Sequence, residues 1–166
     1  MLNFNNPSGK ILNLFEVACE IANFIQEDEK KFYKITIGTD SEVWQDNIAD
    51  FVTAIVVHRK GGGGRYFWRR QVLGNFYNLH DRILKEVVLS LEVGIEILKQ
   101  LKILLEEKWQ KENLPQWTFE IHVDIGENGE TKTMIQEITG MVRAYNFEVI
   151  TKPQSYAASN VADRHI

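Results

Sequence analysis

The sequence predicts an α/β fold built on a mixed five-stranded sheet. Two observations lead to this prediction: three strand-like runs follow one another with short connections, and two further runs are each preceded by a helical pattern. Short turns join antiparallel strands, whereas helical crossovers join parallel ones. We therefore expect three antiparallel strands, then two joined by helical crossovers, with flanking helices and an extra helix at the N-terminus.

Length and composition favour a single domain over residues 1–166, with enough chain to bury a core. Hydrophobic residues make up 44% and charged residues 25%, values that exclude disordered, fibrous and membrane classes. The N-terminus lacks a secretion signal, so we expect a cytoplasmic protein without a membrane partner. The net charge of −4 does not attract polyanions, and binding of nucleic acid would need a local basic patch.

The strand candidates are rich in β-branched and aromatic residues, as pleated segments usually are. Residues 34–40 form the first, which Gly38 and Asp40 are expected to end. The second strand candidate, residues 50–59, contains an almost wholly apolar run and is therefore expected to be an interior strand. The five expected strands are residues 34–40, 50–59, 65–72, 117–124 and 147–151.

Helices are predicted where apolar residues recur at spacings of three and four. The first covers residues 11–25, and a long one follows Asn78, a candidate N-cap, and continues to about Lys111. Gly94 in the long helix would allow close packing. Two shorter helices are expected at residues 131–145 and near the C-terminus.

Two carboxylates, Asp40 and Asp124, each follow an apolar strand. If these strands are parallel neighbours, both carboxylates lie at the same edge of the sheet, where ligands gather in open α/β sheets. Their repulsion would be relieved by Mg²⁺ or Mn²⁺, which prefer carboxylate oxygens and support phosphodiester hydrolysis. The alternative is that each Asp only shapes a turn.

Longer motifs point to a family. The segments IGTDS, VDIGENGETK, EITGMV and KPQSYAASNVADRH resemble the bacterial ribonuclease H-like family typified by YkuK, from about residue 11 to the end of the sequence. The element order is similar to the ribonuclease H fold, in which the first strand, first long helix and fourth strand each supply a carboxylate. The resemblance implies a nuclease that depends on Mg²⁺ or Mn²⁺ and cleaves RNA, an RNA–DNA hybrid or structured DNA.

Carried across by residue, the resemblance implies a catalytic and metal-binding set. Asp40 is the ligand from the first strand, Asp124 from the fourth and Glu86 from the long helix, while Asp163 stands where a fourth acidic or histidine residue occurs. Glu92 is an alternative to Glu86, which lies nearer the start of the helix. His165 is an alternative to Asp163. An ordinary solvated Glu86 and a capping Asp163 are the structural interpretations.

Other functions compete with the nuclease. A non-catalytic module that binds nucleic acid or protein could use the same fold. The run from Val123 to Gly126 resembles an actin-like or sugar-kinase phosphate loop, but that architecture needs two such domains. Trp68 lies among arginines in a hairpin at residues 59–70, where it could stack on a base. The histidines lack zinc-site spacing.

Overall fold

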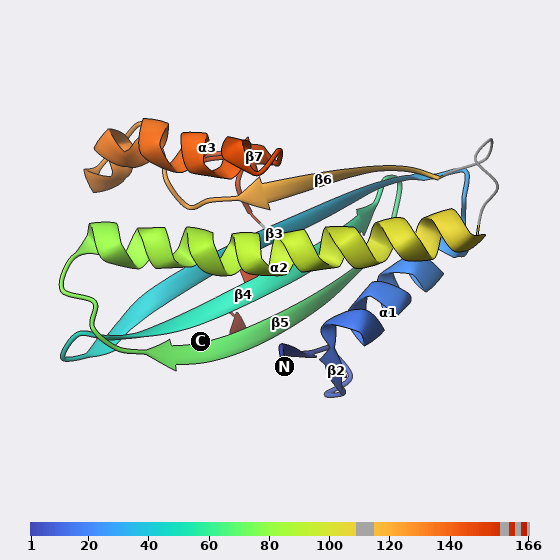
Figure 1. Cartoon of the computed structure of the whole chain (residues 1–166), viewed down its shortest axis with the longest axis horizontal. Helices are drawn as coiled ribbons and strands as arrows, with labels where there is room; N and C mark the ends of the chain where they lie inside the picture. The colour runs from blue at the N-terminus through green and yellow to red at the C-terminus, as the bar shows by residue number, and fades with distance from the viewer. Residues whose placement is uncertain (109–114, 157–159, 162–163, 166) are drawn as a thin grey trace.

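The computed structural model describes residues 1–108, 115–156, 160–161 and 164–165. Its seven strands form one mixed sheet in the order β2-β1-β5-β4-β3-β6-β7 (Figure 1). The elements are β1 Asn3–Asn5, β2 Ile11–Asn13, α1 Leu14–Gln26, β3 Phe32–Gln45, β4 Ile48–Arg59, β5 Gly64–Leu73, α2 Leu79–Lys108, β6 Gln116–His122, a 3-10 helix Glu130–Met134, α3 Ile135–Ala144 and β7 Glu148–Ile150.

The predicted mixed order is present within a larger sheet. Strands β3, β4 and β5 pair antiparallel, and β6 and β7 continue the sheet parallel to β3. The prediction of five strands is wrong because β1 and β2 form an additional antiparallel hairpin beside β5. The expected helix at 131–145 also differs, since its first turn is a 3-10 helix and the α-helix starts at Ile135.

The N-terminal helix starts later than its apolar spacing predicts. Residues 11–13 pair with β1 instead, and α1 begins at Leu14. Asn13 fixes this boundary because its Oδ1 accepts a hydrogen bond from Glu16 N at 2.9 Å, while Glu16 Oε2 accepts one from Asn13 N at 2.8 Å. This reciprocal capping box satisfies two backbone donors at the helix start, which a helix begun at residue 11 would not.

Strand β3 does not end at Gly38 and Asp40, so that expectation is wrong. It pairs with β4 through Gln45, and the chain reverses at Asp46 and Asn47, both with positive φ. Pairing with the apolar run of β4 outweighs the local turn preference of a glycine and an aspartate, because each added residue extends the hydrogen-bonded ladder. Asp40 therefore lies inside a strand, and the β3–β4 hairpin extends beyond it.

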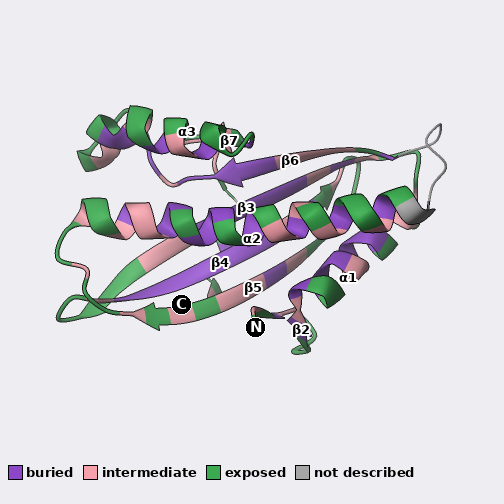
Figure 2. Cartoon of the chain, viewed as in Figure 1, coloured by how far each residue is buried: buried purple, intermediate pink, exposed green. Residues whose placement is uncertain are grey.

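Helices α1 and α2 pack against one face of the sheet, which we call the helical face; α2 crosses in front of the strands in Figure 1. The largest group of buried apolar side chains lies between these layers, and Figure 2 shows buried stretches along both helices and along the strands behind them. Helix α2 comes very close to β6 at Gly94, where an added Cβ would lie 3.1 Å from Ile121 Cδ1. The predicted role of Gly94 in close packing agrees with this geometry.

The long helix begins as predicted. Asn78 Oδ1 accepts a hydrogen bond from Asp81 N at 2.8 Å and so caps α2. Its predicted continuation to about Lys111 falls outside the described residues. Among the helices that the structure describes, none is long and apolar enough to cross a membrane.

Candidate active site

The two aspartates predicted from the sequence lie on neighbouring strands. Strands β3 and β6 are parallel, and their register pairs Gly38 with His122. Two residues after Gly38 comes Asp40 in β3, and two residues after His122 comes Asp124, just beyond β6. The sheet therefore positions both carboxylates at the point where β6 ends, as the crossover argument predicts.

Glu86 approaches the same point from α2. Its side chain is 3% exposed, and Ser41 Oγ donates a hydrogen bond to its Oε1 at 2.5 Å. Its second oxygen, Oε2, is buried and has no hydrogen-bond partner among the described residues. The interpretation of Glu86 as an ordinary solvated glutamate is therefore wrong.

The protonation of Glu86 reflects these surroundings. Its pKa is raised to about 8, chiefly by burial; the negative charges of Asp40 and Asp124 also raise it, while the Ser41 hydrogen bond and the Arg82 charge lower it. A carboxyl group whose pKa is raised both by desolvation and by two other carboxylates is typical of functional sites. Glu86, Asp40 and Asp124 are thus electrostatically coupled.

Asp40 and Glu86 approach from opposite sides of the sheet. Thr39 Oγ1 lies 2.8 Å from Ser90 Oγ of α2, and Ser41 contacts Glu86, so both face the helix. Alternation along β3 then directs Asp40 to the opposite face. In the described part of the chain, no group of three or more His, Cys, Asp or Glu side chains is arranged so that it could hold a metal ion.

Two basic side chains balance part of this negative charge. Lys152 Nζ lies 3.1 Å from Asp124 Oδ1. Arg82 Nη1 donates to Ser41 O at 2.9 Å and lies 3.3 Å from Ser41 Oγ, so it fixes the residue that binds Glu86. Sequence reasoning missed Ser41, Arg82 and Lys152, although the KPQSYAASNVADRH motif contains Lys152.

This structure describes two of the three remaining predicted ligands, His165 and Glu92, but not Asp163. Asp163 lies outside the described residues, so its role stays a prediction. His165 stacks on Trp68 of β5, with ring centroids 3.7 Å apart and planes 12° apart. Glu92 is exposed on α2, in contrast to Glu86 on the same helix. The ring of Trp68 therefore already has an aromatic partner on one face.

His122 is the most buried histidine near the site. Its Nε2 lies 3.0 Å from Glu120 Oε2, and its Nδ1 accepts a hydrogen bond from Tyr156 N at 3.1 Å. Burial lowers its pKa, which favours a neutral ring with the proton on Nε2. His122 thus joins the C-terminal segment to the face of the sheet opposite the helices.

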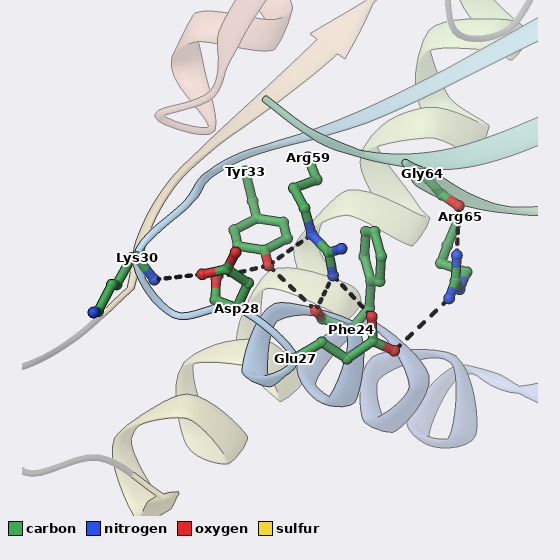
Figure 3. A network of polar contacts seen from close by, with 8 residues as sticks. All are labelled: Phe24, Glu27, Asp28, Lys30, Tyr33, Arg59, Gly64 and Arg65. Atoms are coloured by element: carbon green, nitrogen blue, oxygen red, sulfur yellow. Dashed lines mark hydrogen bonds and ion pairs between the residues drawn. The ribbon is translucent and has the colours of Figure 1, made fainter. Parts of the chain in front are cut away.

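The basic hairpin at residues 59–70 has partners within the protein (Figure 3). Arg59 forms an ion pair with Glu27 at 2.8 Å and donates to Phe24 O at 3.1 Å, and Arg65 lies over the Phe24 ring. Arg70 pairs with the buried Asp50. These arginines fasten the hairpin to α1 and to β4, which is a structural role.

With the order of strands and the site geometry established, the comparisons with known proteins decide the family. The model of the ribonuclease H-like family matches residues 16–166. The chain belongs to this family. The ribonuclease H-like chain is also 33% identical, over 167 residues, to a Bacillus subtilis (strain 168) protein named "Uncharacterized protein YkuK". That match covers 97% of this chain and 95% of the relative, whereas no solved structure matches significantly.

Proposed function

We propose that this ribonuclease H-like protein is a metal-dependent nuclease that hydrolyses phosphodiester bonds in RNA, an RNA–DNA hybrid or structured DNA. The observation that carries the proposal is the buried Glu86, whose Oε2 has no described partner, beside the coupled carboxylates of Asp40 and Asp124. An unpaired buried carboxyl oxygen is costly to desolvate and is rare unless it serves a function.

The residues fit Mg²⁺ or Mn²⁺ in their chemistry. Both ions take carboxylate oxygens, and Asp40, Glu86 and Asp124 supply them. A divalent cation held there would activate a water for attack and neutralise charge on the leaving oxygen. In the described residues these carboxylates are not arranged to hold a metal ion, and Asp40 and Glu86 approach from opposite faces of β3, so binding of one cation by all three requires a rearrangement larger than a change of side-chain rotamer.

The surrounding residues have positioning roles in this proposal. Ser41 donates to Glu86 Oε1 and so leaves Oε2 as the oxygen available for a cation. Arg82 holds Ser41 through the backbone carbonyl of that residue, which restricts the direction from which the hydroxyl donates. Asp163 stays a proposed fourth ligand.

The test measures cleavage of labelled single-stranded RNA, RNA–DNA hybrid and branched DNA in Mn²⁺ and in Mg²⁺. We expect Asp40→Asn to abolish cleavage while leaving circular dichroism and cooperative melting intact. Asp46→Asn is the matched control, because it removes the same charge from an exposed turn of the same hairpin, where asparagine also tolerates positive φ. Equal cleavage by Asp40→Asn and the parent would refute the proposed role of Asp40.

A second candidate function is a non-catalytic module that binds nucleic acid or protein. It is favoured by the absence, among the described residues, of three side chains ready to hold a metal ion. Binding of Mn²⁺ without cleavage of any of the three substrates would support this module and contradict the nuclease.

A further inference from the structure

A cavity of about 470 Å³ lies beside Asp124, between the loop after β6 and the segment after β7. Its walls include Gly126, the carboxylate residue Glu127, Asn128, Lys152 and Gln154. The volume falls within the roughly 300 to 1,000 Å³ usual for small-ligand sites. The cavity therefore has room for a nucleotide-sized group beside Lys152, which contacts Asp124.

Lys152 connects this cavity to the carboxylates. Its backbone N–H donates to Ile125 O at 2.8 Å, which holds the residue beside the loop. The aliphatic part of its side chain passes over Gly126, where an added Cβ would lie 2.9 Å from Lys152 Cβ. The ammonium group ends 3.1 Å from Asp124 Oδ1, while 53% of the side chain stays exposed. Gly126 thus provides the space that Lys152 needs to reach Asp124.

The Lys152–Asp124 pair occupies an oxygen that a metal ion would need. If a divalent cation binds Asp124, that cation neutralises the carboxylate and repels the lysine ammonium. An ammonium has three donors on a flexible stem, so it can turn to a new anionic acceptor. The cavity wall offers amide groups from Asn128 and Gln154, which hydrogen-bond phosphate oxygens well.

We propose that Lys152 exchanges partners, holding Asp124 in the metal-free protein and binding a backbone phosphate of the nucleic acid in the adjacent cavity when a metal ion takes Asp124. This inference rests on the proposed nuclease function, because it names the phosphate subsite of that site. Its geometric basis is the contact of Lys152 with both Asp124 and the cavity. The phosphate would lie between Lys152, Asn128 and Gln154.

Two measurements on Lys152→Gln test the exchange. Calorimetric titration with Mn²⁺ alone should show tighter binding than in the parent, because the competing ammonium is gone. Fluorescence anisotropy of a short labelled single-stranded RNA, in Mn²⁺ and at low temperature, should show weaker binding. The plot of log affinity against log salt concentration should become flatter by about 0.7, the value for one lost phosphate contact on a single strand.

Two further variants sharpen the result. Lys102→Gln removes an equal charge from an exposed site, roughly 24 Å along α2 from Glu86, and should leave both affinities and the salt slope unchanged. Gly126→Ala keeps the lysine but pushes it aside, so it should reproduce the effects of Lys152→Gln. Gel analysis after each titration verifies that the RNA stays intact.

Each result has a distinct meaning. Weaker Mn²⁺ binding by Lys152→Gln, or an RNA affinity and salt slope equal to those of the parent, would overturn the exchange. A parent protein that binds no RNA would overturn it as well. If the parent binds RNA through Lys152 in Mn²⁺ but cleaves nothing, the phosphate subsite stands and the proposed nuclease function fails.

Discussion

Replacing Glu86 with glutamine should change how stability depends on pH in the metal-free protein. Burial and the nearby carboxylates raise the pKa of Glu86 from 4.5 to about 8. Between these values the folded protein keeps a proton that the unfolded chain releases, so the free energy of unfolding falls as pH rises. The stabilisation is complete below the unfolded pKa and lost once pH passes the folded value. Glutamine does not titrate and has no such dependence.

The size of the effect follows from the shift in pKa. Each pKa unit corresponds to about 1.4 kcal/mol, so the loss across the whole window amounts to about 5 kcal/mol. For a chain of this length, 1 kcal/mol moves the melting temperature by roughly 2 to 4 °C. The melting temperature of Glu86→Gln, relative to the parent, should therefore rise by about 10 to 20 °C from acidic to mildly alkaline pH.

Thermal melts in EDTA, followed by circular dichroism across this range of pH, measure the difference between the two proteins. The other ionisable groups are common to both proteins, so their effects cancel in the difference. Glu92→Gln is the control, since Glu92 is exposed on the same helix, and its melting curves should follow the parent. If the curves of Glu86→Gln and the parent run parallel against pH, the pKa of Glu86 is not raised in the folded protein. Added Mn²⁺ should stabilise the parent more than Glu86→Gln at alkaline pH.

Three further changes test the structure around the site. Ser41→Ala removes the donor to Glu86 Oε1 and should destabilise the protein by about 1 to 2 kcal/mol in urea unfolding at neutral pH, and an unchanged midpoint would contradict this contact. Gly94→Val should cost about 1 to 3 kcal/mol, because its side chain would collide with Ile121, and wild-type stability would show that α2 can move away from β6. Tyr33→Phe loses the buried hydroxyl that donates to Asp28 O at 2.9 Å and should lower stability by about 1 to 2 kcal/mol. Unchanged stability would show that water can take the place of the hydroxyl.

The sequence predicted the order of the main strands because their apolar runs are long and separated by clear helical patterns. It predicted wrongly where a local signal competed with a distant one. Gly38 and Asp40 indicated the end of a strand, yet pairing with β4 carries β3 on to Gln45. The β1–β2 hairpin was missed because strands of three residues are too short to show alternation.

The carboxylates of the candidate site could be predicted from the sequence, but their contacts could not. The alignment of Asp40 with Asp124 follows from the parallel pairing of β3 and β6, although Asp40 lies inside its strand rather than at its end, and Glu86 followed from the family resemblance. Ser41 and Glu86, which are in contact, lie 45 positions apart in the sequence. Lys152 and Asp124 lie 28 positions apart. Such pairs depend on how elements pack, which spacing along the chain does not encode.

The arginines of the basic hairpin have a consequence for association between copies of the chain. Strand β5 contains ten residues, but its outer neighbour β1 contains three and is in register with it only at Asn5 and Trp68. Most of the outer backbone of β5 therefore resembles a sheet edge, which invites another chain to add a strand. Arg65, Arg69 and Arg70 lie along this strand, and long charged side chains on an edge strand hinder the pairing of a second chain. The charges first considered for nucleic acid binding thus oppose aggregation through this edge.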